Sequence, residues 1–419
     1  MLAEVRKPLG PVWWSVFLAS ALLAAWGIGW SSWRIAAEGV GVLGVNNNVV
    51  WGLDIVHFVF WIGLGHAGTL ISAVLLLTRQ SWRSPIARGA EQMTLCAVIC
   101  AAVFPVVHVG RVWMAWMASP LPEVSGIWPD MASPLMWDVM AVSTYFLLSL
   151  LYWYIGLVPD FALLRDCCKG RLGWQGTGRQ WRAYEKASLL FAVILTPLVV
   201  SVHSVVSFDF SVTQVPGWHQ SIFPPYFVGG AILSGMAMVQ LILLGVRRLM
   251  AGSGVRRAVT PAILDLSSRF VLALSLVMGA MYLWEHLAAI LNEGSPEPFP
   301  GRNPVNAVFL IVMVAGNVAL PQLFWFRSLR TNCWVIAAVA LGVLAGMWME
   351  RFWIVVNSLK ASLLAANIGD YFPSVTDLAM MAGSVGLFMA LYMALVRVAP
   401  FFSLCDVREQ QSLNKEGGA

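Results

Sequence analysis

Ten apolar stretches, each long enough to cross a bilayer as a helix, follow one another along the chain. A helix needs about 20 apolar residues to span a hydrocarbon core of ~30 Å. Short segments with charged residues and turn-forming proline, glycine and asparagine separate the stretches. The pattern predicts an all-α polytopic membrane protein with spans at 12–30, 51–77, 89–117, 134–157, 187–209, 222–246, 262–291, 304–326, 333–356 and 378–399.

Composition narrows the class further. Of the 419 residues, 59% are apolar and only 11% are charged, against averages of about 45–50% and about 25%. This excludes soluble enzymes, disordered proteins and β-barrels. The first apolar stretch lacks a cleavage signal and is expected to remain as a span. We expect one integral membrane domain over 1–419, divided into a first four-helix bundle (spans 2–5, 45–215), a second (spans 6–9, 216–360) and peripheral spans with the termini (1–44 and 361–419).

The basic residues predict the orientation. All but five of the 26 lysine and arginine residues fall in the terminal segments or in loops on the same side as the termini. The five on the other side are Arg34, Arg111, Arg302, Arg351 and Lys360. Positive charge stays on the cytoplasmic side, so we expect a multi-pass protein of the bacterial inner membrane with both termini cytoplasmic. This also accounts for the net charge of +5 without a nucleic-acid partner.

The six cysteines show no spacing typical of metal or haem attachment, because there is no CxxC, no CxxCH and no grouping with histidine. Cys96 and Cys100 fall inside an apolar span, where buried thiols are the simplest interpretation. We therefore expect no metal site and no iron–sulfur cluster or haem bound by this chain.

A helix rises 1.5 Å per residue, so the position of a residue in a span gives its depth in the membrane. By this measure, most ionisable residues inside the spans lie near the outer ends of the predicted helices. Such residues are costly in a membrane and are often functional. His108 and Arg111 come at the outer end of span 3, Asp138 early in span 4, and His203 and Asp209 late in span 5. Asp54 and His57 occupy the outer end of span 2 and are expected to share one helix face.

Two ionisable residues depart from this distribution. Glu91 begins span 3 at the cytoplasmic side, where it either pairs with Arg88 or Arg83 or takes up protons, with Thr94, His66 and Ser143 as relays. His66 lies deeper in span 2 among small residues, which favours an interhelical hydrogen bond over a ligand role. The predicted proton path consists of Glu91, His66, Asp54 and His57.

A cluster of histidine and aspartate near one membrane face suits quinone chemistry. Quinol oxidation or quinone reduction moves two electrons and two protons, so the ring oxygens need partners that exchange protons near neutral pH. The candidates are His108, Asp138 and Asp209 for catalysis, with His203, Arg111 and Trp137 in the binding site. The alternative is that these side chains only tie helix ends together. Most of the 21 tryptophans are expected to be interfacial anchors.

The order of short motifs resembles the NrfD/PsrC-like family of quinone-interacting membrane subunits. It is most similar to the large subunits of alternative complex III (ActC type) and of the periplasmic quinone reductase complex (QrcD type). The motifs are residues 50–54 (VWGLD), 60–73 (FWIGLGHAGTLISA), 88–94 (RGAEQMT), 105–111 (PVVHVGR), 133–138 (SPLMWD), 159–160 (PD), 201–210 (SVHSVVSFDF), 216–219 (PGWH) and 223–226 (FPPY).

The resemblance implies ten spans, in which two four-helix bundles are flanked by outer helices. It also implies a quinone site near the periplasm that involves His108, Asp138 and Asp209, with His203 and Arg111 close by. The function implied is that of a subunit of a quinol (menaquinol) oxidoreductase complex, with quinone or menaquinone as substrate and a link to proton translocation. The implied partners are a periplasmic iron–sulfur and molybdopterin-like subunit, a multihaem cytochrome c and a second NrfD-like membrane subunit.

Two other functions remain open from the residues alone. A proton-coupled secondary transporter would also use ten spans with internal acids, although its ionisable groups belong near the midplane. A di-haem cytochrome b would need paired histidines at both membrane depths, and the chain has only six histidines.

Overall fold

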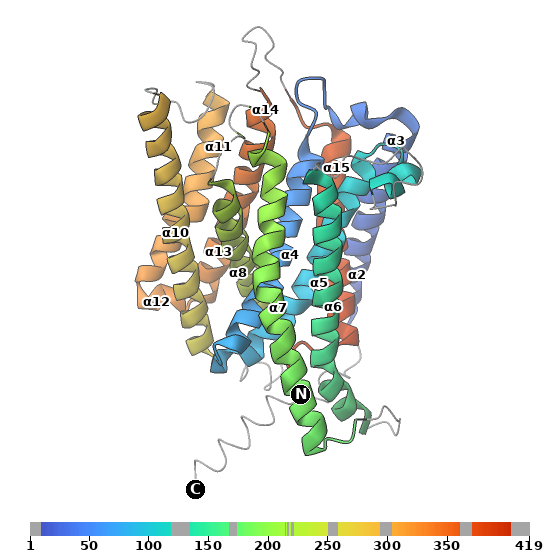
Figure 1. The fold of residues 1–419 in the computed structure, drawn as a ribbon, viewed down its shortest axis with the longest axis vertical. Coiled ribbons are helices and arrows are strands. Elements are labelled where there is room, and N and C mark those ends of the chain that lie inside the picture. Colours follow the sequence, from blue (N-terminus) through green and yellow to red (C-terminus); the bar gives the residue numbers. More distant parts are fainter. Residues whose placement is uncertain are drawn as a thin grey trace.

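The protein is a bundle of long, nearly parallel and antiparallel helices (Figure 1). The computed structural model describes residues 10–118, 134–166, 174–213, 215, 218, 222–249, 259–293, 304–360 and 371–403. Ten helices in these ranges are long and apolar enough to cross a membrane, which confirms the predicted fold class. The spans are α2 (Pro11–Ala24) continued by η1 (Ala25–Trp30) and α3 (Ser31–Glu38), α4 (Leu53–Leu77), α5 (Ser84–His108), α6 (Pro134–Asp166), α7 (Gly178–Ser211), α8 (Phe223–Leu249), α10 (Pro261–Glu293), α11 (Pro304–Val314) continued by η6 (Ala315–Ala319) and η7 (Leu320–Trp325), α13 (Cys333–Phe352) continued by η8 (Trp353–Asn357) and α14 (Ser358–Lys360), and α15 (Val375–Val398).

Short helical segments connect some of the spans. They are η2 (Val40–Leu43), η3 (Ser81–Arg83), η4 (Val112–Ala118) and α12 (Arg327–Arg330). Helix α5 ends at His108 and is followed by η4, so the third span stops nine residues before its predicted end at 117. Conversely, α7 begins nine residues before its predicted start at 187. Thr177 and Gln180 form a capping box there, and the polar first turns extend the helix beyond its apolar part.

Helix α4 forms the centre of the protein and packs against α5, α7, α8 and α13. Nearly all of its side chains are buried, as expected for a helix that is surrounded by other helices rather than by lipid. It therefore joins the first group of helices to the second. A polar group on α4 has no contact with bulk solvent and must find its partner on a neighbouring helix.

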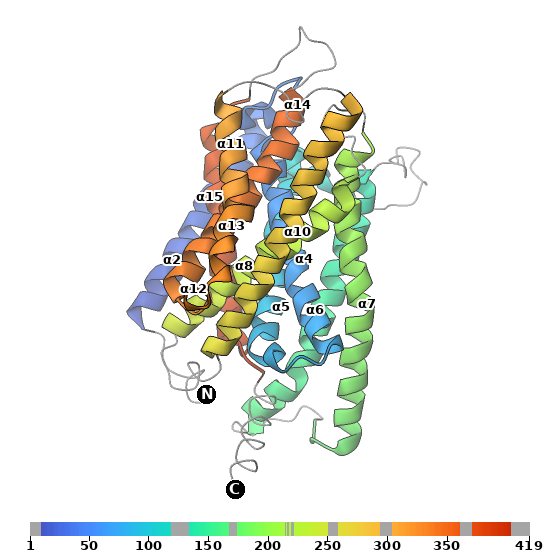
Figure 2. The ribbon, with the colours of Figure 1, turned by 90° about the vertical axis from the view of Figure 1, so that its left-hand side faces the viewer.

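The first and last spans lie side by side on one edge of the bundle, as both views show (Figures 1 and 2). Gly27 and Gly383 have no side chains, and a Cβ on either would collide with the backbone of the other helix. Small residues at such a crossing let two helix backbones approach closely. The pair is fixed to the central helices by the hydrogen bond that the Trp61 indole donates to Ser384 Oγ (3.0 Å).

A similar contact holds α4 against α5. A Cβ on Gly68 would collide with the carbonyl oxygen of Ala90 and come within 2.5 Å of Thr94 Oγ1. We expect Gly68→Ala to lower the free energy of unfolding by about 1–3 kcal/mol, the usual cost of overpacking. Thermal unfolding of the purified protein measures this change. Gly245→Ala is the control, because a Cβ there meets no atom within 4 Å. Equal stability of the two variants would contradict the tight crossing.

Candidate functional site

Polar side chains occur along the whole length of the buried helix α4. Asp54, His57, His66, Thr69 and Ser72 are all buried, and each forms a hydrogen bond to another helix. From the first to the last of them the helix rises about 27 Å, at 1.5 Å per residue. The helix therefore carries buried hydrogen-bonding groups through most of the thickness of a membrane. We call its two ends the Asp54 end and the Ser72 end.

At the Asp54 end, a carboxylate and an imidazole form a close pair. Asp54 Oδ2 lies 2.5 Å from His108 Nδ1, and the side chains are 1% and 27% exposed, respectively. The pair forms because Asp54 is in the first turn of α4 and His108 is the last residue of the antiparallel helix α5. Since Asp54 engages Nδ1, the other imidazole nitrogen of His108, Nε2, remains for a ligand. An imidazole oriented in this way by a buried carboxylate can accept and release a proton.

His57 lies one turn further along α4, and its ring stacks on Phe104 with centroids 5.5 Å apart. The indole Nε1 of Trp348 lies 3.3 Å from His57 Nδ1 and donates to it. This bond connects the first group of helices to α13. The buried Nε2 atom of His57 has no hydrogen-bond partner in the part of the chain that the structure describes.

Asp138 and Asp209 form a second pair, between α6 and α7. Both are buried, and the two carboxyl groups are close enough for the charge of one to act on the other. Two carboxylates in contact inside a protein repel each other, so such a pair can hold one proton between them. The sequence predicts that Asp138 and His108 belong to one quinone site. Among the described residues no hydrogen bond or ion pair joins these two, because His108 is bound to Asp54 instead.

The pair of His66 and His203 lies deeper, between α4 and α7. Their Nδ1 atoms are 2.8 Å apart, so one imidazole donates and the other accepts. The Tyr145 ring packs edge-on against His66, with centroids 4.6 Å apart. The predicted interhelical hydrogen bond of His66 is thus confirmed. Its partner is His203, which the sequence had placed nearer to the outer membrane face. The Nε2 atoms of both rings are buried without partners within the described ranges.

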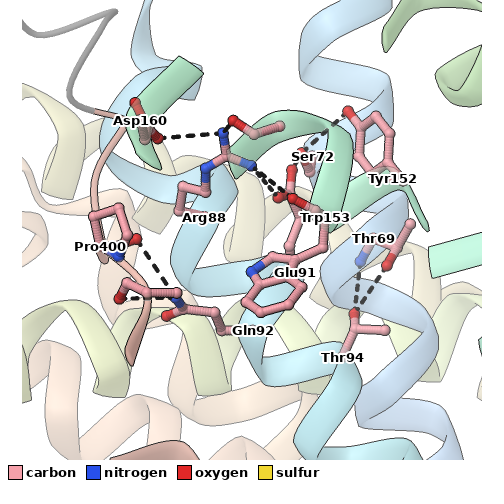
Figure 3. Close-up of polar contacts among 12 residues, drawn as sticks. Thr69, Ser72, Arg88, Glu91, Gln92, Thr94, Tyr152, Trp153, Asp160 and Pro400 are labelled. Atoms are coloured by element: carbon pink, nitrogen blue, oxygen red, sulfur yellow. Dashed lines mark hydrogen bonds and ion pairs between the residues drawn. The ribbon is translucent and has the colours of Figure 1, made fainter. Parts of the chain in front are cut away.

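At the Ser72 end, Glu91 lies in a network of buried polar groups (Figure 3). Ser72 Oγ donates to Glu91 Oε1 (2.5 Å), and Arg88 Nη1 lies 3.1 Å from Glu91 Oε2. Arg88 also contacts Asp160 Oδ2 (3.5 Å) and donates to the carbonyl oxygen of Gly156. The expected pairing of Glu91 with Arg88 is present. A role in proton uptake remains a prediction.

A separate set of hydroxyl groups lies nearer the middle of α4. Thr94 Oγ1 accepts from the Thr69 backbone N–H (2.8 Å) and donates to the Gly65 carbonyl oxygen (2.7 Å), one residue before His66. The hydroxyl of Tyr145 donates to the same carbonyl (2.9 Å). Thr94 is therefore well placed as a relay. Ser143 is not, because its side chain is exposed on the surface of α6, and the expectation for Ser143 was wrong.

Two other predicted site residues lie at the surface. Arg111 is exposed and forms no ion pair with another predicted site residue in the described ranges. Trp137 is 37% exposed at the start of α6, next to the buried Asp138. His219, the last residue of the motif at 216–219, lies outside the described residues.

Sequence reasoning missed a buried charged cluster in the second half of the chain. Glu350 and Arg351 lie in α13 and are 0% and 2% exposed, although Arg351 was counted among the residues of an outer loop. Tyr282 and Asn317 donate hydrogen bonds to Glu350 Oε2. Two adjacent opposite charges inside a predicted span were the available signal, since ionisable residues in a span are rarely accidental.

The fold and these pairs define a polytopic helical membrane protein with acid–base groups inside its membrane-spanning part. The sequence profile of the family "Polysulphide reductase, NrfD" matches residues 41–361, which is most of the chain. The chain belongs to this family, as the motifs predict. The match begins after α3 and ends one residue after α14, so it covers the eight spans from α4 to α14 and leaves out the peripheral pair.

A curated relative gives a further comparison. The chain is 26% identical over 237 residues to a protein of Halobacterium salinarum described as a putative membrane subunit of dimethyl sulfoxide reductase. The aligned part is 56% of this chain, and the chain spans about half (51%) of the relative's length.

Proposed function

We propose that this protein is the quinol-binding membrane subunit of an oxidoreductase complex that moves electrons between membrane quinol and a partner protein. The observation that carries the proposal is the Asp54–His108 pair, an acid–base pair at one end of the bundle whose imidazole is partly exposed. Quinol is amphiphilic and reaches such a site from the lipid. Membership of the NrfD family and the name of the curated relative, a reductase membrane subunit, support the same conclusion.

Oxidation of a bound quinol releases two protons and two electrons, and the described residues provide a base for each proton. One quinol hydroxyl gives its proton to His108 Nε2, and the Asp54 carboxylate stabilises the imidazolium. The second proton goes to the Asp138–Asp209 pair, because repulsion between the two carboxylates favours the state in which the pair holds one proton. The two electrons leave to a redox centre of the partner, and quinone reduction is the reverse.

The partners that we propose follow from the family and not from contacts of this chain. They are a periplasmic iron–sulfur and molybdopterin-like subunit, a multihaem cytochrome c and a second NrfD-like membrane subunit. We place the protein in the bacterial inner membrane with both termini cytoplasmic, because positive charge gathers on one side. The start of α2 and the end of α15 lie at the same end of the bundle (Figure 1), as an even number of spans requires.

Binding of a short-chain menaquinol analogue to the purified complex tests the proposal. We expect saturable binding to the wild-type complex and at least about tenfold weaker binding to Asp54→Asn. Loss of a hydrogen bond to a charged group costs about 1.5–3 kcal/mol, and about 1.4 kcal/mol is tenfold in affinity. Glu38→Gln, at an exposed surface pair with Arg34, is the control. A dithionite-reduced minus oxidised spectrum of the isolated chain should show no haem bands. A wild-type complex without saturable binding would refute the proposal.

Proton movement should depend on Glu91. We propose that Glu91 takes up protons at the Ser72 end and passes them through Thr94 to the His66–His203 pair. Glu91→Gln should leave quinol-linked electron transfer largely intact and lower proton movement in liposomes, because the amide cannot exchange a proton. Asp160 remains as a counter-charge for Arg88, so the fold should persist. Unchanged proton stoichiometry in this variant would leave Glu91 with its structural role alone.

A further inference from the structure

The second half of the chain buries a carboxylate that none of the steps above uses. Glu350 of α13 is fully buried. The Tyr282 hydroxyl of α10 donates to its Oε2 atom, and Asn317 Nδ2 of η6 lies 3.3 Å from the same oxygen. Asn317 Nδ2 also donates to the Tyr282 hydroxyl (2.7 Å), which closes a triangle around Oε2. The other oxygen, Oε1, is buried and accepts no hydrogen bond within the described residues.

The charge next to Oε1 comes from Arg351. Its Nη1 atom lies 3.2 Å from Glu350 Oε1, and both side chains are almost fully buried. The guanidinium carbon is 4.3 Å from the centroid of the Phe227 ring, a cation–π contact with α8. Gly230 leaves room for this arrangement, because a Cβ there would come within 2.7 Å of Arg351 Nη2. The ion pair is therefore enclosed by helices on several sides.

Arg351 also connects this carboxylate to the His66–His203 pair of the first group of helices. The ring of His203 lies against the same Phe227 ring, with centroids 5.9 Å apart. The charge of Arg351 is close enough to act on His203. A chain of buried groups thus runs from His66 through His203 and Arg351 to Glu350, across the boundary between α7 and α13.

Two of the helices that supply this cluster have an irregular geometry close to it. Asn317 lies in the π-helical segment η6, and η8, another π-helical segment, begins two residues after Arg351. Short π-helical turns are rare and occur frequently at functional sites. Gly346 permits the close contact, because a Cβ there would come within 2.6 Å of Asn317 Oδ1. An arrangement that only buried an ion pair would not require two irregular helices.

We propose that Glu350 is a second proton-binding site, and that Arg351 couples its occupancy to that of the His66–His203 pair. A proton binds Glu350 at Oε1, while Tyr282 and Asn317 continue to donate to Oε2. Neutralising the carboxylate removes the counter-charge of Arg351, and the uncompensated positive charge then disfavours an extra proton on the histidine pair. By reciprocity, a proton on the histidine pair disfavours one on Glu350. Protons therefore occupy the two sites alternately.

Other ionisable groups face Glu350 and belong in the test. Apart from Arg351 on its own helix, they are Tyr226 of α8, Tyr282 and Glu285 of α10, and, through Arg351, His203 of α7. Glu285 is the neighbouring acid on which the charge of Glu350 acts, so it is the natural alternative position for the proton.

Infrared spectroscopy of the purified complex without quinol tests the proposal, and its result does not depend on whether quinol binds. As the pH is lowered, wild type should develop the C=O stretching band of a buried carboxylic acid, and Glu350→Gln should lack that band. In the double variant His66→Gln/His203→Gln the band should appear at a pH about one unit higher, because no positive charge can form at either position of the histidine pair. A shift of one pH unit corresponds to about a tenfold change in the proton affinity of Glu350, which is within the usual range for coupled sites.

Matched variants separate the possible outcomes. Glu285→Gln should retain the band, and Glu38→Gln should leave the whole spectrum unchanged because its pair with Arg34 is exposed. Retention of the band in Glu350→Gln, or its loss in Glu285→Gln, would overturn the assignment to Glu350. A band in His66→Gln/His203→Gln at the wild-type pH would overturn the coupling through Arg351.

Discussion

Replacing His108 by alanine should lower quinol-linked turnover by at least about tenfold, since loss of a positioned acid–base group typically costs about 10²–10⁴-fold in rate. Two features of the structure support an effect of this size. The imidazole is fixed by Asp54 Oδ2 at 2.5 Å, and it is the exposed member of the pair. Asp138→Asn should have a similar effect, because an amide opposite Asp209 can no longer share a proton. Steady-state turnover with a menaquinol analogue in the assembled complex measures both.

Assembly and specificity need separate controls. Both variants should assemble with their partners in wild-type amounts, since His108 is at the end of α5 and Asp138 near the start of α6. Glu38→Gln changes an exposed carboxylate and should turn over at the wild-type rate. If the His108 and Asp138 variants both assemble and turn over like wild type, quinone binds elsewhere and this site assignment is wrong.

Because a helix advances a fixed 1.5 Å per residue, the sequence predicts which end of a span each of these groups occupies. It does not predict which side chains meet at one depth. His108, Asp138 and Asp54 were all expected near the same membrane face. Their pairing depends on how each helix is rotated about its axis and on which helices are neighbours, and a single sequence contains neither. The structure pairs His108 with Asp54, and it brings Asp209 close enough to Asp138 for their charges to interact.

The second charged cluster was missed for a different reason. The count of basic residues assigns each arginine to a loop on one side of the membrane. Arg351 was assigned to an outer loop because it lies near the end of a predicted span. Its burial depends on Glu350 next to it and on Phe227 of another helix. The orientation inferred from the count does not depend on this one residue, since the excess of basic residues on one side is large.

A contact between distant parts of the chain was also missed at the Ser72 end. The pair of Glu91 and Arg88 was predictable because the two residues are three positions apart, but the contact of Arg88 with Asp160 was not predicted. Asp160 comes from α6, 72 positions after Arg88, and reaches the guanidinium only through the packing of α5 and α6. The structure therefore changes a pair into a triad with one positive and two negative charges. This difference determines what removal of the arginine should do.

Arg88→Gln should lower the free energy of unfolding by about 3–5 kcal/mol, the usual cost of removing one partner from a buried ion pair. Arg88 is within 3.1 Å of Glu91 and 3.5 Å of Asp160, and all three side chains are 5% exposed or less. Without the guanidinium, Glu91 and Asp160 stay buried and lose the ion pairs that they form with Arg88. Thermal unfolding of the purified complex measures the loss, and Arg34→Gln, at an exposed pair, should cost less than about 1 kcal/mol.

The triple variant Arg88→Gln/Glu91→Gln/Asp160→Asn should recover most of that stability, because it removes the charges together and keeps groups of similar size. Replacing a complete buried ion network by neutral groups is often close to neutral in stability. Comparison with the single variants gives the coupling energy of the triad. If Arg88→Gln alone is as stable as wild type, Glu91 and Asp160 must take up protons when the arginine is absent. That outcome would contradict a purely structural triad and would favour Glu91 as the group that exchanges protons at this end of α4.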